Sequence, residues 1–195
     1  MAAVLSGGTR NAILEAATRL FGGQGYAGTT MRDIASAVGV LPGSLYTHID
    51  GKETLLREIV ESGIDKFLGL GYAAVAGDDS AEIRLRNLIK GHVAIIAQNP
   101  DRTLVVFHQW RFLTGEQLAR VVEKRRQYEL IISTVIEDGF TSGGFDSRLE
   151  RNIAVKSMLG ALNWTAEWFR PDGPETAAEI GDQMADVIVN GLKTR

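Results

Sequence analysis

The segment that most constrains the fold is residues 29–52, which read TTMRDIASAVGVLPGSLYTHIDGK. Its first part predicts a short helix, because Thr30 can cap the N-terminus and Asp33 places a carboxylate in the first turn, where the helix dipole favours it. Gly39 predicts a tight turn in the left-handed conformation that glycine adopts without strain. Pro42 suits the first position of a second helix. The segment therefore predicts two short helices joined by a tight turn.

The apolar positions predict that these two helices pack against each other. Leu45, in the second helix, faces back toward Ile34 and Val38 in the first, and Ala35 is small where the helices cross. Two helices at this spacing form a helix-turn-helix, a motif whose second helix enters the DNA major groove. Because such a helical pair also occurs as ordinary packing, the flanking residues are needed to decide.

The flanking residues resemble the DNA-binding domain of TetR-family transcriptional regulators. RNAILEAATRLFGGQGYAGTT precedes the motif and LYTHIDGKETLLREIV ends it. The family pairs a pattern like IL-x-AA-x-x-LF-x-x-x-GY-x-x-TT with DIA-x-x-xGV-x-x-G-x-LY-x-H and KE-x-L, and this chain matches it at the same spacing. The resemblance implies an all-α fold of about nine helices. Residues 1–55 would form a three-helix, helix-turn-helix DNA-binding domain, and residues 56–195 a ligand-binding and dimerisation domain.

The resemblance further implies that the helix starting at Pro42 reads DNA. Gly43 would let the backbone approach DNA closely, although close packing explains a glycine there equally well. Leu41 and Ile49 depart from the family pattern, which often has a capping serine and a phenylalanine at these positions. Arg32 is as readily a solvated surface arginine as a DNA contact. The residues expected against bases or phosphates are Thr29, Thr30, Arg32, Pro42, Gly43, Ser44, Tyr46, Thr47, His48 and Lys52.

The charge of the chain indicates a site-specific DNA-binding protein rather than one that coats DNA. The formal net charge is −3, and residues 1–60 carry five basic and five acidic side chains. Sequence-independent affinity depends on neutralising phosphates, so a neutral segment gives little of it. The chain has no cysteine, no signal peptide and no apolar run long enough to cross a membrane. We therefore expect a cytoplasmic protein without a membrane partner.

Sequence motifs of catalysis and of cofactor binding are absent. The chain contains no HExxH, no GxSxG and no phosphate-binding glycine loop. Neither His92 nor His108 has a partner at zinc-ligand spacing, and His92, on an apolar helix face, is expected to be a hydrogen-bonded core residue. We expect no catalytic residue, no metal and no cofactor.

Aromatic and polar residues gather in FHQWRF, RRQYELIISTVI and LGALNWTAEWFRPDG. Part of this set must be core, but apolar surface with a few converging polar groups is also typical of ligand cavities. RRQYE, IEDGFTSGGF and GALNWTAEWFRPDGP resemble TetR-family regulators of fatty-acid, aromatic-acid or steroid-ring catabolism, which commonly respond to acyl-CoA thioesters. Guanidinium groups would pair with the phosphates, although each arginine could instead be structural or solvated. The expected ligand-binding residues are Phe107, Trp110, Arg111, Arg126, Tyr128, Ile131, Trp164, Trp168 and Arg170.

The last two predicted helices carry more apolar surface than one subunit can cover. We expect a two-fold homodimer, which requires a near-palindromic double-stranded DNA operator. Its interface would contain residues of the eighth helix together with Ile180, Met184, Val187 and Ile188. The chain is thus interpreted as a transcriptional regulator, a repressor released by a small apolar effector such as an acyl-CoA. The alternatives are a multidrug-sensing repressor, a helix-turn-helix architectural protein without a ligand, and, with little support, an enzyme.

Overall fold

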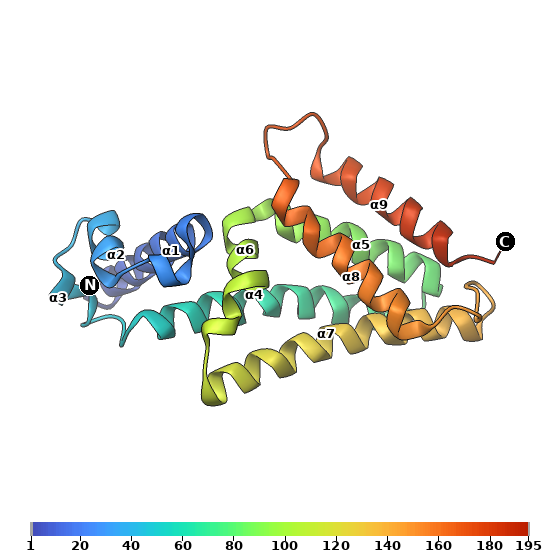
Figure 1. Ribbon diagram of the computed structural model, residues 1–195, viewed down its shortest axis with the longest axis horizontal. Helices are drawn as coiled ribbons and strands as arrows, with labels where there is room; N and C mark the ends of the chain where they lie inside the picture. Colours follow the sequence, from blue (N-terminus) through green and yellow to red (C-terminus); the bar gives the residue numbers. More distant parts are fainter. Residues whose placement is uncertain (1, 195) are drawn as a thin grey trace. The chain divides into compact units, whose positions relative to one another are not determined.

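The computed structural model describes the backbone of residues 2–194 and the side chains of residues 8–194. Within that part the chain contains helices and no strand, which confirms the predicted all-α fold. The elements follow in this order, and Figure 1 labels the α-helices among them: α1 (Ala2–Gly28), α2 (Met31–Val38), α3 (Pro42–Leu45), α4 (Lys52–Val75), α5 (Ala81–Gln98), α6 (Pro100–His108), the 3-10 helix η1 (Gln109–Phe112), α7 (Gly115–Thr141), α8 (Arg151–Trp168) and α9 (Ala177–Leu192).

The chain divides into two compact units. The first contains Met1–Ile64 and Asp101–Val122, and the second contains Asp65–Pro100 and Glu123–Arg195. This structural division differs from the expected boundary at residue 55, because α4 contributes to both units and because α6, η1 and the start of α7 belong to the first. The functional division into a DNA-binding domain over residues 1–55 and a ligand-binding domain over residues 56–195 stays a prediction.

The core of the first unit forms where α2 packs between α1 and α3. Ile34 and Leu45 are fully buried, as the apolar spacing predicts, and Phe21 of α1 is buried with them. The ring of Phe21 meets the ring of Tyr26 edge-on, with 5.2 Å between their centroids. Gly25, with φ of 80°, breaks α1 just before Tyr26. This break turns the chain toward α2.

The second unit is built around α5, which packs against both α8 and α9 (Figure 1). The helices α5 and α9 approach closely at Gly181, where an added Cβ would lie 3.2 Å from the Cα of Lys90. Ion pairs border this contact, and the Arg86 guanidinium lies 2.6 Å from the Asp186 carboxylate. Because these pairs are exposed, they contribute little, and burial of apolar residues stabilises the contact. The buried residues of α9 include Ile180, Ala185, Val189 and Leu192.

Across the part of the chain that the structure describes, no helix combines the length and the hydropathy needed to cross a membrane.

Candidate DNA-binding and effector sites

The start of α2 is fixed by a reciprocal hydrogen-bonded cap. The Asp33 backbone N–H donates to the Thr30 hydroxyl at 3.2 Å, and the Thr30 backbone N–H donates to the Asp33 carboxylate at 2.7 Å. These hydrogen bonds, the backbone one first, lower the pKa of Asp33. At the other end of α2, Gly39 adopts φ of 72°, the left-handed turn that the sequence predicts. Local sequence thus sets the turn between α2 and α3.

The helix α3 presents small groups and bare backbone to solvent. Leu45 points inward and is fully buried, whereas Pro42, Gly43 and Ser44 are exposed. A Cβ built on Gly43 would meet no atom within 4 Å. Packing inside the protein therefore does not require glycine at this position, and the close-packing interpretation is wrong. What remains is an open backbone surface on α3.

The other residues expected at DNA surround this surface. Tyr46 follows α3 directly and its side chain is 57% exposed. The Thr47 hydroxyl donates to the Ser44 carbonyl oxygen at 2.7 Å and is exposed. His48 is half-buried, and Arg32 is exposed on α2. These four side chains are accessible for contacts with bases or phosphates.

Thr29 and Lys52 have partners inside the protein that the sequence did not predict. Thr29 is fully buried and its hydroxyl donates to the Gly25 carbonyl at 2.8 Å, so its side chain does not face solvent as a DNA contact would. The Lys52 ammonium donates to the carbonyl oxygens of Tyr26 and Thr29, both at 2.8 Å, and lies 4.2 Å from the centre of the Tyr26 ring. An ammonium has three N–H groups, so one is left for a phosphate.

Residues distant in sequence hold the same loop. The Tyr26 backbone N–H donates to the side-chain oxygen of Gln109 at 3.0 Å, and the Tyr26 and Phe112 rings lie 5.3 Å apart. The Glu53 carboxylate accepts from the backbone N–H and the hydroxyl of Thr114 at 3.2 and 3.1 Å. These contacts attach the segment after α6 to the end of α1 and the start of α4, which flank α2 and α3 in the chain. No motif pointed to these contacts, because Gln109 and Thr114 lie 83 and 61 residues further along the chain than their partners.

Three of the expected ligand-binding residues belong to the first unit. Phe107 is buried at the end of α6, and the Trp110 indole N–H donates to its carbonyl oxygen at 3.1 Å. Arg111 is exposed, and its guanidinium carbon lies 5.1 Å from the centre of the Trp110 ring. The six others belong to the second unit, so a single pocket containing all nine stays a prediction.

Tyr128 and Ile131 lie in the core of the second unit, where Tyr128 has a polar partner. Its hydroxyl is 3.1 Å from Nδ1 of His92, which is 1% exposed. Burial lowers the pKa of His92 to about 3, partly opposed by a hydrogen bond with Asn163. Burial likewise raises the pKa of Tyr128. His92 is therefore a neutral, hydrogen-bonded core residue, as the sequence suggested, and the Tyr128 hydroxyl is already engaged within the protein.

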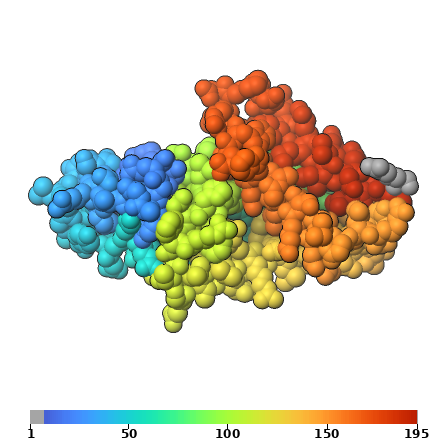
Figure 2. Space-filling view, in the orientation of Figure 1, coloured from blue at the N-terminus to red at the C-terminus, as the bar shows by residue number. Residues whose placement is uncertain are grey.

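Trp164 and Trp168 share a face of α8, as expected, but that face is turned to solvent. Their side chains are 63% and 45% exposed, because the opposite face of α8, with Met158 and Leu162, packs into the unit. Figure 2 shows α8 running across the visible surface with no other segment over it. Arg170, just after α8, donates to the carbonyl oxygens of Glu167 and Phe169 at 3.2 and 2.9 Å. The two tryptophans therefore lie on the surface of the second unit and not in its core.

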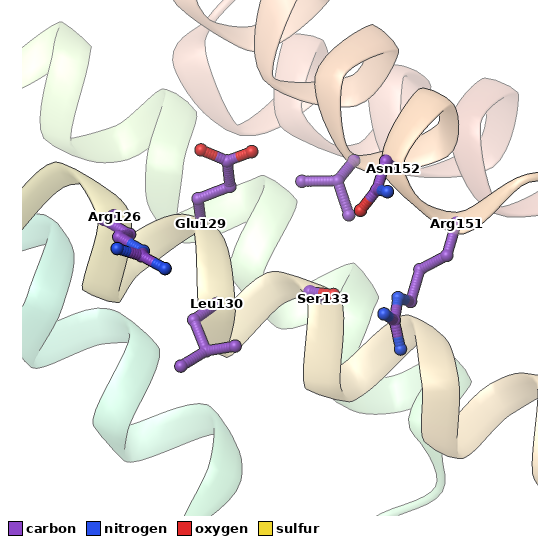
Figure 3. Close-up of a pocket in the computed structure, with 7 residues that line it drawn as sticks. Arg126, Glu129, Leu130, Ser133, Arg151 and Asn152 are labelled. Atoms are coloured by element: carbon purple, nitrogen blue, oxygen red, sulfur yellow. The ribbon is translucent and has the colours of Figure 1, made fainter.

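Arg126 lies at an open pocket of about 300 Å³ between α7 and α8 (Figure 3). Arg126, Glu129, Leu130 and Ser133 line it from α7. Arg151, Asn152 and Val155 line it from the start of α8. Arg151 also pairs with Glu137 at 2.9 Å. Two arginines from different helices thus border one pocket.

The exposed side of α9 continues the apolar surface of α8. Val187 is 75% exposed, and Met184 and Ile188 are half-buried. These three residues, with Ala161 and Gln183, line a shallow pocket of about 250 Å³. Ile180, expected on the same surface, is only 7% exposed. Its expected place at an interface is therefore corrected to the core of the unit.

A capped helix, a glycine turn and an exposed second helix with open backbone have the geometry of a helix-turn-helix, the motif with which many transcriptional regulators bind DNA. Comparison with known families agrees. Residues 13–59 match the bacterial regulatory proteins of the tetR family, and residues 78–192 match the tetracyclin repressor-like C-terminal domain. The chain belongs to the TetR family of transcriptional regulators. This membership confirms the resemblance read from the sequence and the expectation of a regulator rather than an enzyme.

Relatives align over nearly the whole chain. The HTH-type transcriptional repressor KstR2 of Rhodococcus jostii (strain RHA1) is 28% identical over 186 residues, covering 95% of this chain and 91% of the repressor. The structure of the ketosteroid transcriptional regulator KstR2 of Mycobacterium tuberculosis superposes with a TM-score of 0.90 at 24% identity, covering 95% of both chains. AibR, solved in complex with isovaleryl coenzyme A and operator DNA, superposes with a TM-score of 0.80 at 29% identity, covering 94% of this chain and 97% of that one.

Proposed function

We propose that this chain is a repressor that binds a near-palindromic operator as a homodimer and is released from it by an acyl-CoA thioester. The proposal that the chain binds operator DNA rests on the open backbone of α3 at Gly43, beside the exposed Ser44 and Tyr46. Gly43 and Ser44 face the major groove, while Tyr46, His48 and the free N–H of Lys52 reach phosphates.

The choice of effector is supported by the relatives. AibR is similar over nearly the full length of this chain and was solved with both isovaleryl coenzyme A and operator DNA. An acyl-CoA needs an apolar site for the acyl chain and cationic groups for the phosphates, and this chain has exposed arginines on α7 and α8. Binding of the thioester must favour the conformation that does not bind DNA, because equal affinity for both conformations would shift nothing.

The homodimer is supported by the apolar surface of α8 and α9. Large side chains that a stable monomer would bury, including Trp164, Trp168 and Val187, are exposed there. Exposed apolar surface of this kind marks a protein–protein interface. A second copy of the chain, related by two-fold symmetry, would cover it with the same residues. The proposed interface contains Ile153, Ala161, Trp164, Trp168, Met184, Val187 and Ile188.

The test uses DNA that flanks the gene of this chain, together with fragments selected from a random pool by the purified protein. Fluorescence anisotropy would measure operator affinity in the presence of acyl-CoAs of increasing chain length, the matching free acids and lipophilic drugs. We expect a thioester to release DNA and its free acid to have no effect. Release by free acids or drugs alone would contradict the acyl-CoA assignment and favour a multidrug-sensing repressor. No effect of any compound would favour an architectural protein.

A further inference from the structure

The three arginines expected to pair with phosphates have different surroundings. One nitrogen of the Arg170 guanidinium, Nη1, donates to two carbonyl oxygens at the end of α8, and the guanidinium of Arg111 lies over the Trp110 ring. Within residues 8–194, whose side chains the structure describes, no acidic side chain pairs with Arg126, and it borders a pocket. Arg126 is therefore the arginine best placed to bind an added anion.

The pocket beside Arg126 contains further groups that favour an anion. Arg151, whose Nη1 also pairs with Glu137 at 2.9 Å, supplies a second guanidinium from α8, and Figure 3 shows Ser133 between the two arginines. Arg151 and Asn152 are the first two residues of α8, so their backbone N–H groups have no acceptor within the helix. The Glu150 carboxylate caps this N-terminus by accepting from the Ile153 N–H at 2.8 Å, and the N–H groups of Arg151 and Asn152 lie beside that cap. Two guanidinium groups, a hydroxyl and a helix N-terminus thus surround one cavity.

The remaining lining favours a nucleotide over an inorganic phosphate. Glu129 and the Asn152 side-chain oxygen offer acceptors for ribose hydroxyl or adenine amino groups. Leu130, which is 64% exposed, and Val155 offer apolar contact for a base. The volume of about 300 Å³ is at the lower end of the range for ligand pockets, so it holds part of a large ligand.

We propose that the pocket between α7 and α8 binds the phosphate-bearing nucleotide end of the effector, with Arg126 and Arg151 pairing with its phosphates. This inference rests on the proposed acyl-CoA effector. It assigns Arg151, Ser133 and Asn152, which no motif singled out, to effector binding. The acyl chain is bound elsewhere, because the pocket is open to solvent and five of its seven lining residues are charged or polar.

The test is calorimetric titration of the purified full-length protein with a series of acyl-CoAs, the matching S-acyl pantetheines, which lack the nucleotide, and adenosine 3′,5′-bisphosphate. The variants are Arg126→Ala and Arg151→Ala. The matched control is Lys156→Ala, which removes the same charge from α8 outside the pocket. For the tightest-binding thioester we expect each arginine variant to lose about 10- to 100-fold in affinity, as for charge-assisted hydrogen bonds. Affinity for the S-acyl pantetheine should not change.

Three results would overturn the proposal. They are wild-type affinity of both arginine variants for acyl-CoA, an equal loss in Lys156→Ala, and an equal loss of pantetheine binding. A crystal structure of the homodimer with the partner subunit covering the pocket would also overturn it. If the wild type binds no thioester, the proposed effector class fails. In that case, binding of adenosine 3′,5′-bisphosphate that Arg126→Ala abolishes would still support a nucleotide site, and absence of such binding would refute it.

Discussion

The surface of α3 and the surface of α8 and α9 are both exposed, but they expose opposite kinds of groups. Around Gly43 the chain shows mainly backbone, hydroxyls and a tyrosine, with Leu41 as an exposed apolar side chain and Leu45 turned inward. On α8 and α9 it shows tryptophan and valine side chains, although each helix already buries another apolar face. Small polar surface accommodates a partner with its own dense hydrogen-bonding groups, such as DNA. Large apolar surface requires a partner that excludes water, such as a second subunit.

The largest expected effect comes from substitutions in α9, at the proposed dimer interface. In the double variant Val187→Asp with Ile188→Asp, two carboxylates would be buried without partners at the proposed interface. We expect dimer affinity to fall at least about 100-fold, measured by analytical ultracentrifugation. Asn190→Asp, on an exposed position of α9, should dimerise like the wild type. A double variant that stays a soluble dimer of wild-type affinity would refute the interface.

At α3, adding a single methyl group should lower the affinity for DNA without lowering the stability of the protein. Gly43→Ala adds a Cβ that meets nothing in the free protein, so thermal stability should not fall. Against DNA the same methyl would clash, and we expect operator affinity to drop about 10- to 100-fold, an overpacking cost of 1–3 kcal/mol. Gly69→Ala in α4, where the added Cβ also meets open space, is the matched control. Equal operator affinity of both variants would place α3 away from the DNA backbone.

In the core of the second unit, the buried His92 predicts a pH dependence of stability. Its pKa is about 3 in the folded protein and 6.5 in the unfolded chain, so the unfolded chain takes up the proton first. Stability therefore falls as pH drops below 6.5, by up to about 1.4 kcal/mol per pH unit from this group. Urea unfolding between pH 7 and 5 should show the slope. It should weaken in His92→Gln and persist in His108→Gln, in which an exposed histidine is replaced; the opposite pattern would remove His92 from this role.

The smallest expected effect concerns Lys52, which takes part in both the internal structure and the proposed DNA contact. Lys52→Met leaves the carbonyl oxygens of Tyr26 and Thr29 without this donor, so stability should fall by about 1 kcal/mol. Loss of one phosphate contact should flatten the salt dependence of operator binding by roughly one unit. Lys66→Met, an exposed position in α4, should change neither quantity. A lower stability with an unchanged salt slope would make Lys52 purely internal.

Local signals made the DNA-reading part predictable. Thr30, Gly39 and Leu45 each act within a few residues of their own position, so cap, turn and packing could be inferred from the sequence. The contact between Gln109 and Tyr26 could not, because 83 residues separate the partners and neither residue type is specific.

The spacing of apolar residues could not predict which faces of α8 and α9 are buried in the subunit and which are exposed. An apolar spacing shows that a helix has a buried face, but α9 has two apolar faces. Ile180 belongs to the buried one, and Val187 belongs to the exposed one. Trp164 and Trp168 were correctly placed on one face of α8, yet spacing alone does not say whether that face meets the core or a partner. The pocket at Arg126 and Arg151 likewise depends on the approach of two helices, which no single segment encodes.

The central claim is that two copies of α3, related by the symmetry of the α8 and α9 surface, read one site. Hydroxyl-radical footprinting on a selected operator, with the stoichiometry of the complex measured in parallel, tests it most directly. We expect two protected half-sites related by a two-fold axis, with centres about 10–10.5 base pairs apart or a multiple of that distance. Protection of a single half-site by one subunit, or uniform protection without symmetry, would contradict the account.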